Sequence, residues 1–447
     1  MRDHPGLSLF YEAKMKRMSI KYFVFLSVLM SAIISANATK SDHEKIIKKN
    51  EEGRLPLKEL RIFTQVFEQV RRGYVDEVTD LQLLESAVVG LLMELDPHSA
   101  YLDVEEHTKL QESASGQYGG LGIEISAKRG LLEVIAPIDD SPAQKAGIRT
   151  GDLIHEINGE PVRAFALPEA IDKLRGPKGS SIDLSILREG EDKPIFFNII
   201  RDIIYSSSVR SRVLLSDIGY VRISQFQENS DKDFIAALKK LNKSDRLNDG
   251  LKGLIIDLRN NPGGLIPPAV EIANALLDEG LIVYTEGRAP SANQKFSARP
   301  GQLLEDIPIV ILINGGTASA SEIVAGALQD HSRAAILGTQ SFGKGSVQTV
   351  IPFGDGRAIK LTTARYFTPL GRSIQAEGIT PDITIPRAET KILDTNPRPR
   401  ERDLDGHLKS QDQETYNEQP GATEVEHDNQ LKEAVHILKG FKLLKKS

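Results

Sequence analysis

The stretch Asn314-Gly-Gly-Thr-Ala-Ser-Ala-Ser-Glu-Ile323 follows the apolar run 309–313 and leads into the helix-forming run 322–328. We interpret these segments as a buried strand, a tight turn and a helix. Ser319 then stands at a strand-to-helix turn, and the next N–H lies at a helix N-terminus, where it can stabilise an oxyanion. A simpler interpretation is also open, because Ser319-x-x-Glu322 is a capping box, and many such boxes only start helices.

Strand and helix patterns alternate on both sides of this stretch. Proline fits the first turn of a helix, so Pro267 or Pro268 marks a helix start. This alternation predicts a mostly parallel sheet with helices on its faces, and therefore a mixed α/β fold. The expected strands are 218–223, 253–258, 309–313, 334–338 and 347–352, and a further helix is expected over 231–241.

Residues 117–204 have a different, β-rich pattern. Glycines precede an alternating strand in Tyr118-Gly-Gly-Leu-Gly-Ile-Glu-Ile125, and Asp140-Ser-Pro-Ala143 and Gly151-Asp-Leu-Ile154 follow. This order resembles a PDZ domain, and an ordinary β-rich domain with glycine turns is the alternative. The resemblance implies that N–H groups of the glycine loop, around Gly119, Gly120 and Leu121, hold a peptide's terminal carboxylate. The expected substrate-binding residues are Tyr118, Gly119, Gly120, Leu121, Gly122 and Ile123.

The N-terminus has the charge, apolar and small-residue order of a secretory signal. Four basic residues between positions 14 and 21 precede the apolar run 22–34, and Ala36-Asn-Ala38 follows. We expect cleavage after Ala38, and an uncleaved anchor is the alternative, although the run is short for a membrane span. The 447 residues have a net charge of −6 and include no cysteine. This composition favours a bacterial periplasm without disulfides and gives no basic surface for nucleic acid.

Amphipathic helices are expected on both sides of these domains. Two lie over 57–70 and 80–95, and the turn Asp96-Pro-His-Ser99, whose His98 we interpret as structural, ends the second. The polar stretch 394–427 is expected to be disordered. A last short helix, with an apolar side formed by Leu431, Ala434, Val435 and Leu438, is expected to dock on the body or on a partner. A membrane-surface role for this helix is the weaker alternative.

A serine nucleophile needs a base. His331 lies at the far end of the helix that Ser319 begins, about 15 Å away or more at the helical rise, which is too far for proton transfer. Lys344 is the better candidate, because the flanking Gly343 and Gly345 let it enter a tight site, and Gln348 on the following strand can hold its amine. The pKa of Lys344 must then fall far below that of free lysine, which requires a buried site without a nearby carboxylate.

The oxyanion donors can also be predicted. Ala320 supplies the N–H directly after the nucleophile, and Asn261-Pro-Gly-Gly264 is a second glycine turn between a strand and a helix. We favour Gly264 as the second donor, with Gly263 as the alternative. An ion pair between Asp257 and Arg259 can fix this turn, or both can be ordinary polar residues at a strand end. Ser321 remains the rival nucleophile.

Three motifs together resemble the carboxy-terminal processing proteases, over about residues 55–388. They are Asp257-Leu-Arg-Asn-Asn-Pro-Gly-Gly264, Gly316-Thr-Ala-Ser-Ala-Ser-Glu322 and Ser341-Phe-Gly-Lys-Gly-Ser-Val-Gln348. The resemblance implies a crotonase/Clp-protease-like α/β core with an inserted PDZ domain and an N-terminal helical segment. It implies a serine endopeptidase with Ser319 as nucleophile, Lys344 as general base and Gln348 as its positioning partner. Thr317 stands where family members often carry serine.

The resemblance further implies exported polypeptide substrates with apolar C-termini, bound by the PDZ domain and cut near that end. Arg175, at a helix end, is an expected contact for movement of the PDZ domain, with a solvated helix-capping charge as the alternative. No metal or cofactor is expected. We further expect a homo-oligomer (a dimer), an adaptor protein and peripheral membrane association. The rival classes are a non-catalytic PDZ scaffold and an acyl-CoA enzyme of the crotonase type. The expected domains are a signal peptide 1–38, a helical segment 39–115, a PDZ domain 116–204, a peptidase core 205–388 and a polar tail 389–447.

Overall fold

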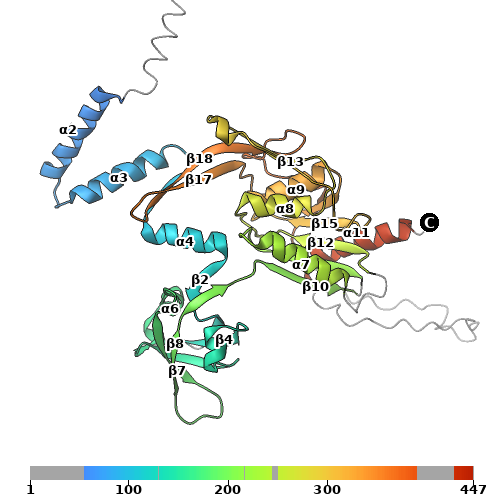
Figure 1. The fold of residues 1–447 in the computed structure, drawn as a ribbon, viewed down its shortest axis with the longest axis horizontal. Coiled ribbons are helices and arrows are strands. Elements are labelled where there is room, and N and C mark those ends of the chain that lie inside the picture. The colour runs from blue at the N-terminus through green and yellow to red at the C-terminus, as the bar shows by residue number, and fades with distance from the viewer. Residues whose placement is uncertain (1–54, 129, 216, 244–249, 390–426, 446–447) are drawn as a thin grey trace, which may run out of the picture. The chain divides into compact units, whose positions relative to one another are not determined.

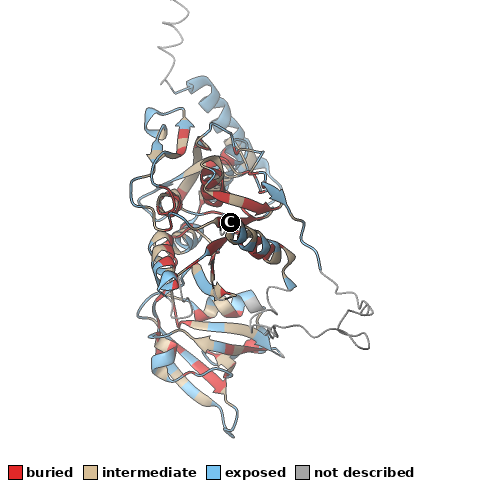
Figure 2. Cartoon of the chain, turned by 90° about the vertical axis from the view of Figure 1, so that its right-hand side faces the viewer, coloured by how far each residue is buried: buried red, intermediate tan, exposed pale blue. Residues whose placement is uncertain are grey.

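The computed structural model describes residues 55–128, 130–215, 217–243, 250–389 and 427–445 (Figure 1). The expected signal peptide, and all but the last residue of the stretch expected to be disordered, lie outside these ranges. The chain divides into two compact units between Val88 and Val89. The first unit contains α2 (Leu57–Gly73), which has no buried residue and is mostly exposed in Figure 2, and most of α3 (Asp80–Met93). No helix in the described ranges combines the length and apolar character needed to cross a membrane.

In the second unit, the glycine-rich region forms an antiparallel sheet in the order β3-β4-β5-β7-β8, with β6 beside β5. Its core is apolar, and Val134, Ile154 and Ile186 are fully buried in it. The bounds are β3 Ile123–Lys128, β4 Leu131–Pro137, α5 Pro142–Ala146, β5 Leu153–Ile157, β6 Glu160–Pro161, α6 Leu167–Leu174, β7 Ser181–Leu187 and β8 Ile195–Ile200.

A two-stranded ribbon carries the chain into and out of this sheet. β2 (Gln117–Gly120) pairs antiparallel with β9 (Asp202–Tyr205), and Ser206 N–H donates to the Gly116 carbonyl at 2.9 Å. Gly119 and Gly120 therefore lie inside a paired strand. The expectation that they belong to an open glycine loop is wrong, because they pair with the returning strand from the far end of the domain, a partner that local sequence does not reveal.

The core of the second unit is a six-stranded sheet in the order β10-β11-β12-β15-β16-β19. Pairs from β11 to β19 are parallel, as the alternating pattern predicts, and β10 adds an antiparallel edge strand. Every residue of β12 and β15 is buried, which explains their continuous apolar sequences. The bounds are β10 Val209–Leu214, β11 Ile218–Ile223, β12 Gly253–Asp257, β15 Ile309–Ile313, β16 Ala334–Gly338 and β19 Ile383–Thr384.

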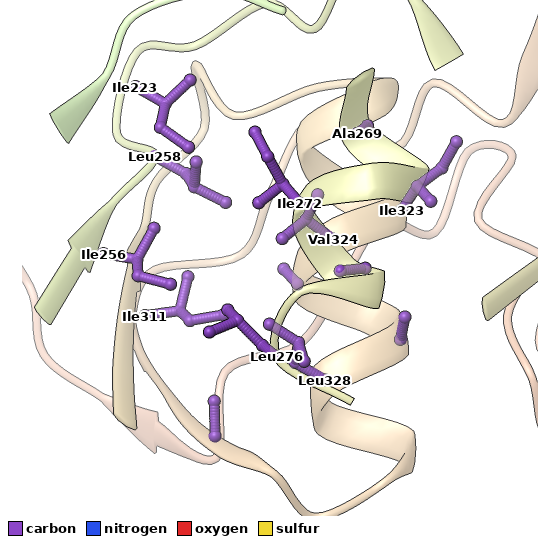
Figure 3. Packing of buried hydrophobic residues seen from close by; sticks show 14 of the residues in the cluster. Ile223, Ile256, Leu258, Ala269, Ile272, Leu276, Ile311, Ile323, Val324 and Leu328 are labelled. Atoms are coloured by element: carbon purple, nitrogen blue, oxygen red, sulfur yellow. The ribbon is translucent and has the colours of Figure 1, made fainter. Parts of the chain in front are cut away.

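Helices cover both faces of this core sheet. One face packs against α7 (Ser230–Asn242), α8 (Ile266–Asn274) and α9 (Ala320–Asp330), and Figure 3 shows strand residues such as Ile256 and Ile311 beside side chains of α8 and α9. The other face packs against α11 (Asn429–Lys445). The apolar side of α11 is buried there, which confirms that the last helix docks on the body. Its residues Leu431, Ala434, Val435 and Leu438 are each at most 2% exposed.

The second unit also contains a separate antiparallel sheet. Its strand order is β1-β18-β13-β14, and β17 also pairs with β18. The strand pattern predicts that β17 belongs to the parallel sheet, and this prediction is wrong, because β17 pairs antiparallel with β18. A strand pattern predicts that a strand exists but not which strand is its neighbour. The bounds are β1 Ala100–Leu102, β13 Leu281–Gly287, β14 Lys295–Ser297, β17 Ser346–Pro352 and β18 Ala358–Phe367, and α4 (Val104–Ser115) follows β1.

Candidate active site

Ser319 joins β15 to α9 in a backbone conformation that non-glycine residues rarely adopt, with φ of 57° and ψ of −118°. Such strain costs about 1–3 kcal/mol and persists only where neighbouring groups enforce it. Here Ala318 N–H donates to the Asn261 carbonyl at 2.9 Å, and Ser319 N–H donates to the Glu322 carboxylate at 2.7 Å. Ser319 is partly exposed between the buried Ala318 and Ala320. A strained, partly exposed serine between a strand and a helix is typical of a nucleophile elbow.

Glu322 has a larger role than the helix cap that the sequence indicates. Its fully buried carboxylate accepts four hydrogen bonds. One oxygen accepts Ser319 N–H at 2.7 Å and Lys344 N–H at 2.9 Å, so the two candidate catalytic residues share a single acceptor atom. The other oxygen accepts the Ser341 hydroxyl at 2.6 Å and Gly343 N–H at 2.7 Å. Burial raises the pKa of Glu322, although all four hydrogen bonds favour its charged form.

Replacing Glu322 by glutamine is expected to lower the free energy of unfolding by about 2–4 kcal/mol and to reduce proteolysis, because an amide group cannot accept hydrogen bonds on its nitrogen side. Denaturant unfolding and kcat for a polypeptide substrate measure the two effects. Glu305→Gln, at an exposed site, is the matched control and is expected to change neither. Unchanged stability in Glu322→Gln would show that the four hydrogen bonds do not hold the two loops together.

Lys344 is half-buried, and its ammonium has no hydrogen bond or ion pair with any residue in the described ranges. Burial lowers its pKa, and the positive charge of Lys360 adds to this effect. Asp96 and Glu322 act in the opposite direction. A lysine that acts as a base is expected to need a site without a nearby carboxylate. That condition is not met, because Glu322 is close, but the carboxylate oxygens are occupied by the four donors above.

Gln348 lies on β17, and its amide nitrogen donates to the Ser346 hydroxyl at 2.9 Å and to the Thr362 hydroxyl at 3.4 Å. These contacts place Gln348 and Ser346 on one side of the strand. A bulge between Val347 and Gln348 interrupts the pairing with β18, and no hydrogen bond joins Gln348 to Lys344 among the described residues.

Tyr366 on β18 is a site residue that the sequence analysis missed. Its hydroxyl donates to the Lys344 carbonyl, and its N–H donates to the Gly345 carbonyl at 3.0 Å. Burial raises the pKa of Tyr366 well above its usual value, Glu322 adds to the rise, and a hydrogen bond with the Ser319 side chain opposes it. Tyr366 thus touches both candidate catalytic residues, but a tyrosine far from any motif gives no signal in the sequence.

The turn Asp96-Pro-His-Ser99 also reaches this region. The Ser99 hydroxyl accepts Thr362 N–H at 3.1 Å, beside the Thr362 side chain that contacts Gln348. Burial lowers the pKa of His98, and the charge of Lys344 lowers it further. The turn therefore lies near the lysine, which the sequence analysis did not foresee.

The second glycine turn lies against the serine. A Cβ atom on Gly263 would stand 2.7 Å from the Ser319 Cβ and 3.0 Å from the Ala320 nitrogen, so only glycine fits there. Gly263 N–H is occupied, since it donates to the Asn261 side chain at 2.9 Å. Within the described residues, the N–H groups of Gly264 and Ala320 have no acceptor. This arrangement favours Gly264 over Gly263 as the second oxyanion donor.

The rival nucleophile and the rival base are both engaged elsewhere. Ser321 is fully buried, and its hydroxyl donates to the Asn261 carbonyl at 3.1 Å. His331 ends α9, and its imidazole Nε2 lies 2.7 Å from the Leu281 carbonyl. Both residues therefore hold neighbouring backbone in place.

The turn before β3 has features of a carboxylate site. The N–H groups of Leu121 and Gly122 have no acceptor among the described residues, and their carbonyls accept hydrogen bonds from Ala143 and Ile138 at 3.0 and 2.8 Å. Ile123 begins β3, whereas Tyr118 belongs to β2. Arg175 follows α6, and its guanidinium lies 4.8 Å from the centre of the Tyr118 ring. Leu121 is thus the one of the three expected carboxylate-binding residues that lies in this turn, whereas Gly119 and Gly120 belong to the paired strand β2.

The sequence matches known families in three places. The pattern of Peptidase family S41 matches residues 217–385, that of the PDZ domain matches 133–188, and that of the activating protease CtpB N-terminal domain matches 22–106. The last match includes residues 22–38, which the sequence analysis assigns to a signal peptide.

Related proteins match most of the chain. A carboxy-terminal-processing protease of Bartonella bacilliformis is 45% identical over 93% of this chain and 94% of its own length. A probable CtpA-like serine protease of Staphylococcus epidermidis is 34% identical over 86% of this chain and 77% of its own. Among solved structures, the photosystem II D1 C-terminal processing protease is 30% identical, covers 72% of this chain and 92% of its own, and superposes with a TM-score of 0.43.

Proposed function

Because the chain belongs to the carboxy-terminal-processing serine proteases of peptidase family S41, we propose that it cleaves polypeptides near their C-termini with a Ser319–Lys344 dyad. Ser319 attacks the substrate carbonyl while Lys344 takes its hydroxyl proton. The N–H groups of Ala320 and Gly264 stabilise the oxyanion, and one such donor is typically worth about 3–4 kcal/mol. Lys344 then gives its proton to the leaving amine, and water hydrolyses the acyl-enzyme.

One observation carries this proposal: Ser319 N–H and Lys344 N–H bind the same oxygen of Glu322. One buried carboxylate therefore fixes the position of the serine turn relative to the lysine turn. The lowered pKa of Lys344, first from burial and then from Lys360, supports a neutral amine that can act as a base. Gln348 is proposed to position this amine when substrate is bound.

Substrate recognition is assigned to the PDZ domain. The free N–H groups of Leu121 and Gly122 suit a terminal carboxylate, while the exposed edge of β3 suits an added peptide strand. We propose that apolar C-termini of exported proteins bind here, with Gly119, Gly120 and Tyr118 supporting the turn from β2. Movement of the domain through the Arg175–Tyr118 contact is part of the same proposal.

The setting of the protein is proposed from the sequence. We place it in the periplasm after removal of residues 1–38, with a helical segment 39–115, a PDZ domain 116–204, a peptidase core 205–388 and a polar tail 389–447. A dimer, an adaptor protein and peripheral membrane association belong to the same expectation.

Blocking the substrate's terminal carboxylate tests this recognition. Two unfolded peptides with the same apolar end are compared, one with a free C-terminus and one amidated. Amidation is expected to lower kcat/KM by about 10- to 100-fold, mainly through KM, because hydrogen bonds to a charged group are lost. A peptide in which an internal glutamate is replaced by glutamine is the control. Equal kcat/KM for the free and amidated peptides would show that the terminal carboxylate is not recognised. The Ser319–Lys344 dyad would be tested separately, by whether the peptides are cleaved at all.

A further inference from the structure

The start of α11 is bound to the turn that precedes Gly264. Arg259 donates to both carboxylate oxygens of Asp428, at 2.9 and 2.7 Å, and to the Gln430 side chain at 3.0 Å. It donates to both oxygens of Asp257 at 3.0 and 2.7 Å. All five guanidinium N–H groups are thus occupied, and the Arg259 side chain is only 13% exposed. A guanidinium held on both sides in this way has one orientation.

Arg259 is also the first residue of the turn 259–264. Its own N–H donates to Asp257 at 3.0 Å, and two residues later the Asn261 carbonyl accepts Ala318 N–H at 2.9 Å and the Ser321 hydroxyl at 3.1 Å. Further along, Phe226 N–H donates to the Gly263 carbonyl at 2.9 Å. The backbone between Arg259 and Gly264 therefore connects the guanidinium directly to both sides of the serine turn.

Asp428 carries charge in this network. Burial acts to raise its pKa, but hydrogen bonds from Arg259 hold the pKa below its usual value, so the carboxylate is ionised at neutral pH. The other carboxylate bound to Arg259, Asp257, has a side chain that is 1% exposed and also accepts the Tyr220 hydroxyl at 2.8 Å. Losing Asp428 would leave one edge of Arg259 without its acceptor in a mostly buried site.

The helix has a separate attachment at its other end. Lys442 forms an ion pair with Asp217, and the apolar side of α11 is buried along the core sheet between the two ends. These contacts hold α11 on the sheet without Asp428. Asp428 differs from them because it contacts Arg259 of the 259–264 turn.

We propose that α11 contributes to catalysis through Asp428 at its start. Asp428 holds Arg259, and Arg259 positions the 259–264 turn so that the Gly264 N–H can stabilise the oxyanion. Asp428 is a positioning residue, since it touches Arg259 and no reacting atom. This inference rests on the proposed function, because it assigns the role of Gly264 to that reaction. It also ties the chain's last helix, beyond all three motifs, to the chemistry.

The substitution Asp428→Asn in the full chain tests the inference. Asparagine keeps the helix cap, in which Asp428 accepts Leu431 N–H at 3.1 Å, but it removes the charge and one acceptor for Arg259. We expect kcat to fall about 10- to 100-fold with KM nearly unchanged, since small displacements of catalytic groups have effects of this size. Lys442→Gln is the matched control, because it removes the ion pair at the other end of the same helix; kcat is expected to stay within about twofold of the parent.

Thermal unfolding of both variants separates positioning from stability. A kcat loss in Asp428→Asn no larger than that in Lys442→Gln, at equal Tm, would overturn the inference. If Asp428→Asn does not fold, Asp428→Glu retains the charge but displaces it by one methylene, and an unchanged kcat in that variant would also overturn it. The proposed function fails separately, through cleavage that survives in Ser319→Ala.

Discussion

Replacing Ser319 by alanine is expected to reduce kcat by about 10⁴-fold or more, with the peptide still bound. The change removes the only hydroxyl proposed to form the acyl-enzyme, while Glu322 still accepts the N–H of residue 319. The fold is expected to persist, because alanine requires no more space in the strained turn than serine. Cleavage of an unfolded polypeptide with an apolar C-terminus, followed by intact mass, measures kcat and locates the cut.

Ser321→Ala is the control for this prediction. It removes a buried hydrogen bond to the Asn261 carbonyl, which is worth about 1 kcal/mol of stability. Activity is expected to remain within about tenfold of the parent, because no bond is formed at Ser321. Cleavage that survives in Ser319→Ala, or an irreversible serine reagent that labels Ser321, would show that the nucleophile has been chosen wrongly.

Replacing Lys344 by alanine is expected to reduce kcat by about 10²- to 10⁴-fold, the usual contribution of a general base. The base must be neutral, so kcat/KM of the parent is expected to rise with pH through the lowered pKa of Lys344. Three charged groups act on this amine, namely Lys360, Asp96 and Glu322, and the His98 imidazole, whose pKa is lowered by burial and by Lys344, lies near it. A pH profile of kcat/KM with no rising limb below pH 10.5, the ordinary pKa of lysine, would show that Lys344 is not the base.

Two substitutions are expected to shift this profile in opposite directions. Lys360→Gln removes a positive charge that disfavours the ammonium, so the pKa of Lys344 rises and the rising limb moves to higher pH. Asp96→Asn removes a negative charge that favours the ammonium, so the limb moves to lower pH. The asparagine side chain keeps an oxygen for the His98 and Ser99 N–H groups of the turn. Shifts in the same direction in both variants would exclude an electrostatic cause.

Local pattern predicted the core sheet well and the second sheet poorly. The central strand β15 is buried on both faces, so its sequence is a continuous apolar run after Pro308, and β15 and β16 match the expected ranges. β18 is only partly buried along most of its length, and β1 has three residues, so neither gives a strong period. The pairing of β17 with β18 followed from neither strand's own sequence.

The candidate site shows a similar division. Ser319, Lys344 and the glycine turn are conspicuous because small residues surround them, and small residues mark places where backbones approach closely. Tyr366 and Asp428 are far from any motif and act through single hydrogen-bonding groups. The sequence indicates only a helix cap at Glu322, because the capping-box pattern predicts the hydrogen bond from Ser319 N–H and not the other three.

The sequence by itself determined the family motifs, the α/β alternation, the PDZ resemblance and a serine and lysine on two separate turns. Only the tertiary structure decided that one oxygen of Glu322 binds both turns, that Gly264 and not Gly263 has a free N–H, and that α11 reaches Arg259. The reason is physical: periodicity and turn chemistry arise from neighbours along the chain. A shared acceptor or a free N–H is decided by groups that folding brings together from distant positions.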